Sequence, residues 1–276
     1  MKLTFLGTAG PDQIPSPFCD CQTCTHARKN RGYDLRKRCS YLINDDLLVD
    51  MGADLYAACS MYDISLMDMK YALVTHSHHD HFYAQNIKQR RLGYHHQEMP
   101  PKLLFAAPPS VMTLLDVAAV NDKRVGLKRR PVLPFDTFNM GHYKVTALKA
   151  THIPSIGDAV NYIIDDGNKK VLIASDTAVY EEDVWPYLKN AELDQLVIEC
   201  AVGVNTHLEA AQTRHLSING VEMMIDKMKE INAITDHTSI YVTHFTHKHC
   251  LPHDEMNEIF KDLGAQCAHD GLVLKI

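Results

Sequence analysis

The chain has 276 residues, of which 28 are lysine or arginine and 34 are aspartate or glutamate, so its net charge near neutral pH is −6. Hydrophobic residues account for 46% of the sequence and charged residues for 22%, which is typical of a soluble globular protein. The length suits one domain over residues 1–276. No apolar run is long enough to cross a bilayer, so we expect no membrane binding. Because the net charge is negative, we do not expect a general nucleic-acid binder.

The N-terminal part of the chain predicts the beginning of a β-sheet. Residues 2–6 alternate between polar and apolar side chains, and the stretch Gly7-Thr-Ala-Gly-Pro11 ends this strand. Two further strands, at residues 36–43 and 47–50, are separated by three polar turn residues and form a hairpin. A helix is expected within residues 54–69.

Three thiols lie close together in a proline-bounded loop at about residues 15–30. They are Cys19, Cys21 and Cys24, and thiolates at this spacing can bind a structural zinc ion whose fourth ligand comes from elsewhere in the chain. The alternative is three unrelated free thiols, which would be prone to oxidation in a polar loop. The chain has eight cysteines and no export signal, so we expect reduced thiols in the cytoplasm, with the other five as small core residues.

The densest cluster of candidate metal ligands follows a short apolar strand. Residues 71–75 predict the strand, and His76-Ser-His78-His79-Asp80-His81 comes directly after it. Residues two apart in an extended chain point the same way, so the first and second of these histidines can bind one ion. A helical turn after them would bring the aspartate and the last histidine to a second ion, and this ligand set suits zinc, iron or manganese. The alternative is a solvated histidine-rich loop, which is how we interpret Tyr94-His-His-Gln.

The pattern after the motif predicts helices at residues 82–92 and 110–120, a loop at 94–101 and a strand at 103–107. Residues 123–130 are strongly basic. Such a run usually forms a solvated face, and a role in attracting an anionic substrate is the alternative.

In the second half of the chain, a further candidate ligand follows each of three predicted strands. The strands at residues 143–150, 170–175 and 239–243 are followed by His152, Asp176 and His244 in turn. A fourth strand is expected at residues 195–200. Together these residues would supply the further metal ligands that the histidine motif needs from the rest of the fold.

The His-x-His-x-Asp-His motif at a strand end resembles the signature of the metallo-β-lactamase superfamily, and Gly-Thr-x-Gly after the first strand is similar to its ribonuclease Z-like branch. The resemblance implies an α/β fold, an αββα sandwich of two mixed sheets flanked by helices, with two divalent ions, zinc or manganese, between the sheets. It assigns one ion to His76, His78 and His152, the other to Asp80, His81 and His244, and a bridging role to Asp176. Two such ions lower the pKa of a shared water and stabilise the oxygens of a phosphoryl group.

The stretch Thr213-Arg-His215-Leu-Ser217 resembles the superfamily segment whose histidine reaches over the metals and donates a proton. The resemblance therefore makes His215 the catalytic acid, alongside Asp80 at the metals, and Ser217 the cap of a helix that runs to residue 228. The superfamily usually has glycine where this chain has Arg214. His207 is the alternative acid.

The cysteine loop resembles the branch that contains the phosphoribosyl cyclic phosphate phosphodiesterase of the carbon–phosphorus lyase pathway and the pyrroloquinoline quinone biosynthesis B proteins. In that phosphodiesterase the fourth ligand of the structural zinc is a histidine three residues after the last active-site histidine, a position that His247 holds here. The resemblance runs from Gly7 to about Glu255 and departs in residues 95–130 and at Arg214.

The resemblance implies a dinuclear metal-dependent phosphodiesterase that acts on a small cyclic phosphate ester, and it is compatible with a homodimer. A ribonuclease Z-like nuclease is one alternative, although no basic Gly/Pro-rich RNA-binding arm is evident in the sequence. A non-hydrolytic metalloprotein similar to the pyrroloquinoline quinone biosynthesis B proteins is the other. The full set of seven ligands argues against an inactive relative.

Overall fold

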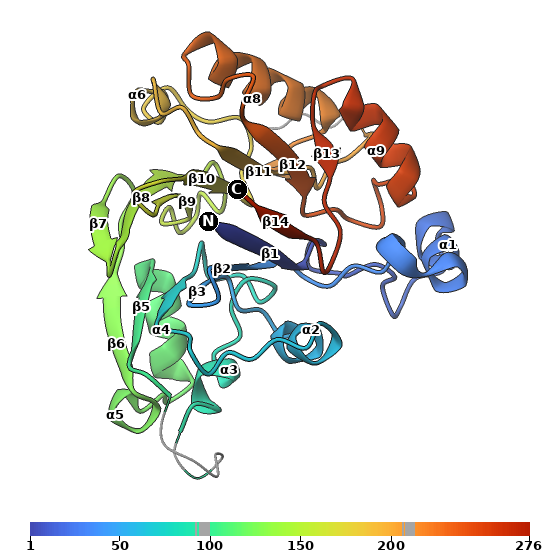
Figure 1. Ribbon diagram of the computed structural model, residues 1–276. Coiled ribbons are helices and arrows are strands. Elements are labelled where there is room, and N and C mark those ends of the chain that lie inside the picture. Colours follow the sequence, from blue (N-terminus) through green and yellow to red (C-terminus); the bar gives the residue numbers. More distant parts are fainter. Residues whose placement is uncertain (92, 94–99, 206, 208–212) are drawn as a thin grey trace.

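Two seven-stranded sheets pack face to face in the computed structural model, and helices cover their outer faces (Figure 1). The structure describes residues 1–91, 93, 100–205, 207 and 213–276. The first sheet has the order β14-β1-β2-β3-β4-β5-β6 and the second β13-β12-β11-β10-β9-β8-β7. Each sheet contains both parallel and antiparallel pairs. In the first sheet β3 and β4 are parallel and β1 and β2 antiparallel, and in the second β10 and β11 are parallel and β9 and β10 antiparallel. The predicted fold class is therefore confirmed.

The strands of the first sheet are β1 (Lys2–Gly7), β2 (Ser40–Ile43), β3 (Leu47–Val49), β4 (Tyr71–Leu73), β5 (Leu103–Ala107), β6 (Leu127–Pro131) and β14 (Val273–Lys275). Those of the second sheet are β7 (Thr137–Met140), β8 (Tyr143–Lys149), β9 (Val160–Asp165), β10 (Lys170–Ala174), β11 (Gln195–Glu199), β12 (Ser239–Thr243) and β13 (Gln266–Cys267).

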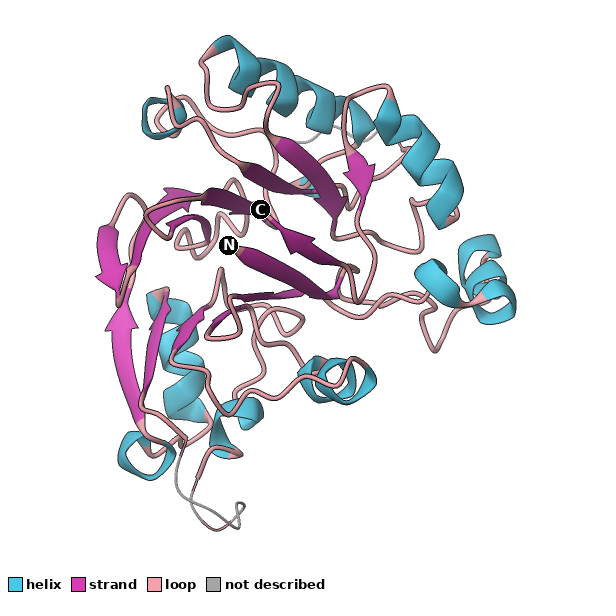
Figure 2. Cartoon of the chain, in the orientation of Figure 1, coloured by secondary structure: helices cyan, strands magenta, loops and turns pink. Residues whose placement is uncertain are grey.

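Most helices lie on the two outer faces of the sandwich, whereas α1 projects at its side (Figure 2). The helices are α1 (Gln22–Asn30), α2 (Leu55–Met61), α3 (Gln85–Lys88), α4 (Pro109–Val117), α5 (Asp122–Val125), α6 (Trp185–Leu188), α8 (Ile218–Glu230) and α9 (His253–Lys261), with a 3-10 turn at Gly32–Asp34. Within the described residues no helix is both long enough and apolar enough to span a membrane.

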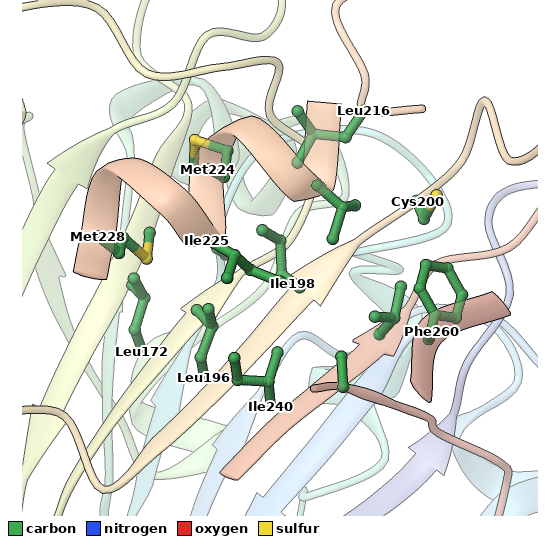
Figure 3. Packing of buried hydrophobic residues seen from close by; sticks show 14 of the residues in the cluster. Leu172, Leu196, Ile198, Cys200, Leu216, Met224, Ile225, Met228, Ile240 and Phe260 are labelled. Atoms are coloured by element: carbon green, nitrogen blue, oxygen red, sulfur yellow. The ribbon is translucent and has the colours of Figure 1, made fainter. Parts of the chain in front are cut away.

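The alternation of side chains along the strands divides the core into layers. In β11, Leu196 and Ile198 face the helical side of the second sheet, whereas Val197 faces the space between the sheets. Figure 3 shows Met224, Ile225 and other apolar residues of α8 over this outer face. Since apolar side chains cover both faces, the central strands read as continuous hydrophobic runs.

Two local predictions differ from the structure. The helix expected at residues 82–92 is confined to α3, because Arg90 turns inward and its guanidinium donates to the carbonyls of Val125 and Pro101. Cys24 lies in α1 rather than in a loop, and the Cys21 sulfur accepts the Cys24 N–H at the helix start. The loop predicted at residues 94–101 lies mostly outside the described part.

The basic run at residues 123–130 crosses α5 and β6, and two of its five charges, Arg129 and Arg130, have partners within the fold. Arg129 pairs with Asp116 and Asp122. The Arg130 guanidinium lies over the Phe138 ring, 4.4 Å from its centroid. These contacts favour a structural role over attraction of a substrate.

Candidate active site

The histidine motif forms a tight turn at the carboxyl end of β4. The backbone N–H groups of His81 and Phe82 both donate to the carbonyl of His78, so the turn is compact and the predicted helix starts only at Gln85. Met51 N–H also donates to the carbonyl of His81, which ties the motif to the end of β3. Gly52 is required at this contact, because a Cβ there would lie 2.0 Å from the backbone oxygen of Asp80.

The strand ends of the second sheet bring the remaining predicted ligands to this turn. Ligand atoms within 4.8 Å of one another form two groups that share one aspartate: His76, His78, His152 and Asp176, and Asp80, His81, His244 and Asp176. All of these residues are buried except His78, which is exposed.

Asp176 lies between the two groups and turns one carboxylate oxygen towards each. Its Oδ2 lies 3.4 Å from His76 Nε2 and 3.5 Å from His152 Nε2. Its Oδ1 lies 2.7 Å from His244 Nε2 and 3.2 Å from His81 Nε2. Only a carboxylate has two acceptor oxygens that can serve two ions in this way.

Other groups hold the outward ring nitrogens of His81 and His152, which fixes how these two rings are oriented. His81 Nδ1 donates to Asp50 Oδ2 at 2.7 Å, and Asp50 also accepts from the Thr75 N–H at 2.8 Å. His152 Nδ1 lies 3.3 Å from the backbone oxygen of Arg214. Asp50 was predicted only as the end of a strand, and its role as a support becomes visible in three dimensions.

The cluster fits divalent metal ions. His76 Nε2 is buried and faces Asp176, yet it makes no hydrogen bond, which a buried ring nitrogen normally does unless it binds an ion. Burial holds the pKa of His76 well below its ordinary value, so the ring is neutral, as a ligand must be. Burial alone would raise the pKa of Asp176, but the imidazoles of His244 and His81 hold it well below its usual range.

The predicted structural site is also assembled, between the start of α1 and the loop after β12. Its ligand atoms lie within 4.8 Å of one another and belong to Cys19, Cys21, Cys24 and His247. Burial alone would raise the pKa of Cys21, but hydrogen bonds from the Cys24 N–H and His247 lower it to about 6. A thiolate with this set of neighbours suits a tetrahedral zinc ion.

A family model described as a beta-lactamase superfamily domain matches residues 46–268. The chain belongs to the metallo-β-lactamase superfamily. No curated protein matches the sequence significantly.

Solved structures of this superfamily share the fold over nearly the whole chain. A diphosphatase of the PhnP family has 20% identity and a TM-score of 0.77, with 99% of this chain and 96% of that chain covered. Zinc-bound PqqB from Methylobacterium extorquens has 19% identity and a TM-score of 0.77, with both chains covered completely. The short form of human tRNase Z has 15% identity and a TM-score of 0.69, with 100% and 99% covered.

In this metallo-β-lactamase fold, the predicted acid His215 lies at the rim of the metal cluster. Its ring centroid is 4.8 Å from that of His152 and 5.8 Å from that of His244. Its Nδ1 donates to Glu199 Oε1 at 2.6 Å, which leaves Nε2 as the ring nitrogen free to exchange a proton. The alternative acid His207 lies in an exposed turn.

Glu199, like Asp50, supports a candidate site residue and was not identified from the sequence. It is fully buried at the end of β11, and its carboxylate also accepts the N–H groups of Thr177, Ala201 and Leu216. Burial alone would lower the pKa of His215, but the charge of Glu199 raises it above its ordinary value. A strand-end glutamate sixteen residues before a histidine carries no spacing signal.

Proposed function

We propose that this protein is a dinuclear metal-dependent phosphodiesterase that acts on a small cyclic phosphate ester, such as a phosphoribosyl cyclic phosphate. The observation that carries the proposal is the placing of one shared aspartate between two histidine groups, with a carboxylate-supported histidine at their rim. Two divalent ions, zinc or manganese, held by these residues would supply Lewis acidity, activating water and neutralising the charge of the phosphate oxygens.

The chain's own residues supply the proton that a phosphodiester needs. When a ribose alkoxide leaves phosphorus it is strongly basic, and a general acid accelerates its departure. Glu199 keeps Nδ1 of His215 protonated and fixes the ring, so Nε2 can donate a proton at the rim of the cluster. His215 is about one-quarter exposed, at 23% of its side chain, which allows a substrate oxygen to reach it.

The same acid separates the proposal from a diphosphatase and from a non-hydrolytic role. Cleavage of a diphosphate, as in the PhnP-family neighbour, releases a phosphate that departs readily without a proton. A PqqB-like role without hydrolysis gives no use to the pair of His215 and Glu199. A structural zinc ion, held by the cysteine cluster, would stabilise the fold without taking part in the reaction.

A panel of substrates on metal-loaded protein tests this proposal. We expect the highest kcat/KM on a small cyclic phosphodiester, with lower values on a nucleoside diphosphate derivative and on a tRNA precursor with a 3′ extension. Metal analysis of the same preparation should give two ions in the active site and one zinc. Faster turnover of the tRNA precursor would replace the proposal with a nuclease, and faster turnover of the diphosphate would replace it with a diphosphatase.

A further inference from the structure

A cavity of about 180 Å³ lies on the helical side of the first sheet, between α2 and α3. Both helices cover this side of the sheet in Figure 1. Most of the cavity wall is apolar and comes from Met51, Leu55, Leu66, Met67 and Met69. An apolar cavity of about 150 Å³ can hold one benzene molecule, so this cavity suits a ligand of similar size.

The polar side of the cavity comes from α3 and the two residues that follow it. Asn86, Gln89 and Arg90 line this side, and their spacing of three and four positions places them on one side of the turn. The amide nitrogen of Asn86 is already used, because it donates to the carbonyls of Met51 and Gly52. Arg90 is the one charged residue that the structure describes in this wall.

Arg90 is a buried cation whose hydrogen-bond acceptors are neutral. Only 7% of the residue is exposed, and its guanidinium donates from Nε to the carbonyl of Val125 and from Nη2 to that of Pro101. Burial lowers the pKa of Arg90, and no acidic group of the described chain opposes this effect. A charge that leaves water without a counter-charge is costly to bury.

The other buried arginine has the counter-charge that Arg90 lacks. Among the described residues, Arg36 and Arg90 are the lysines or arginines that are buried. Arg36 lies near the carboxylate of Asp270, since burial raises the pKa of Asp270 and Arg36 is one of the groups that counteract the rise. The contrast indicates that an anion is missing beside Arg90.

The guanidinium of Arg90 is open to a ligand. Its Nη1 makes no hydrogen bond with any described residue. In the described part of the chain, none of the fully buried side-chain atoms that lack a partner belongs to Arg90, so Nη1 keeps accessible surface. Since Arg90 lines the cavity, a carboxylate placed there can accept a charge-assisted hydrogen bond from this nitrogen.

We propose that this cavity binds a small monocarboxylate, whose carboxylate pairs with Arg90 and whose apolar body packs against the methionines. One negative charge matches one guanidinium, whereas a phosphate dianion would leave excess charge among apolar side chains. Thioether side chains adapt to the shape of a ring, as at Met67 and Met69. The cavity is separate from the metal ligands but lies behind their turn, because Met51 donates its backbone N–H to the carbonyl of His81.

Calorimetric titration of the metal-loaded protein with benzoate tests the proposal, and benzamide is the neutral analogue of the same shape. Benzoate should bind and raise the melting temperature, because a ligand that binds only the folded chain stabilises it. Benzamide should bind at least tenfold more weakly, since a hydrogen bond to a neutral acceptor contributes less than one to a charged acceptor.

Arg90→Met should weaken benzoate binding at least tenfold and abolish the preference for benzoate over benzamide. Lys88→Met is the matched control, because it removes a cation from the same helix at a position that does not line the cavity. It should bind benzoate like the wild type.

Met67→Glu gives a second test that does not depend on the folding of Arg90→Met. Met67 is 42% exposed in the cavity wall, so the fold should tolerate a carboxylate there, and its charge should repel benzoate. Met223→Glu, at an exposed position of α8, is its control and should bind benzoate like the wild type. Absence of benzoate binding, or equal binding in the wild type and in the cavity variants, would overturn the proposal and leave the phosphodiesterase assignment untouched.

Discussion

At the scale of single residues, the candidate two-metal site depends most on Asp176, because its two carboxylate oxygens face two different ligand groups. The residue has a positive φ of 51°, a left-handed conformation that is uncommon for any residue except glycine. The fold holds this conformation at the end of β10, which directs the carboxylate into the cluster.

We expect Asp176→Asn to remove nearly all hydrolysis and to lower metal occupancy in both groups. An amide keeps the shape of the side chain but offers one neutral acceptor oxygen, so it is a poor bridge between two cations. Metal analysis and turnover of the purified variant measure both effects. Full metal content together with full turnover would contradict the bridging role.

Glu199→Gln should shift the pH dependence of turnover. Glu199 raises the pKa of His215, and an acid works only while it is protonated, so turnover falls as pH rises through that pKa. Without the negative charge the pKa falls, and the alkaline limb of the profile should move to lower pH. A variant that merely lost stability would keep the wild-type profile at reduced amplitude, and such a profile would argue against this role.

At the scale of elements, the two candidate metal sites share one short segment after β12. His244 belongs to the candidate active site and His247 to the cysteine cluster. Phe245 lies between them, and its backbone N–H donates to the carbonyl of Thr8 while its carbonyl accepts the Gly10 N–H. His247 Nε2 also lies 3.5 Å from Asp12 Oδ2, which orients the ring whose Nδ1 faces Cys21. The cysteine cluster thus anchors α1 against the segment that supplies an active-site ligand.

Cys21→Ser should destabilise the fold more than it alters the reaction. A structural zinc contributes its binding energy to folding, so the loss of one thiolate should lower the melting temperature and release one zinc. The two active-site ions should remain, and kcat should change little below the new melting temperature.

Cys59→Ser is the matched control, since Cys59 lies in α2 outside the cluster. It should keep all three ions. Unchanged stability in Cys21→Ser, with only two ions in the wild type, would show that the cysteine cluster holds no zinc.

At the scale of the whole molecule, the sequence predicts the elements that carry local patterns. The strands before His76, His152 and His244 have apolar runs bounded by polar residues, and all three are observed. The strands β13 and β14 are two and three residues long and depend on pairing with distant partners, so no local pattern marks them.

Asp50 and Glu199, which hold the rings of His81 and His215, were not predicted for a similar reason. Asp50 and His81 are 31 residues apart, and only the parallel pairing of β3 with β4 brings them together. Glu199 meets His215 because β11 ends beside the segment before α8. By contrast, Ser217 was predicted as the cap of α8 and does accept the Gly220 N–H, since a cap is a local contact.

A homodimer is compatible with the resemblance to the phosphodiesterase branch. For a homodimer, light scattering of the purified chain should give roughly twice its mass of 31.2 kDa. A mass that equals one chain at all concentrations would leave the active site unaffected, because its ligands all come from one chain.

The most direct test of the account is the effect of His215→Ala on two substrates with different leaving groups. A general acid contributes about 10²–10⁴-fold to rate, so turnover of a cyclic ribose phosphate should fall on that scale while metal content stays unchanged. A nitrophenyl phosphodiester releases an oxyanion that needs no proton, so its turnover should fall much less. An equal loss on both substrates would contradict the role of His215 as the acid, and with it the central step of the proposed phosphodiesterase.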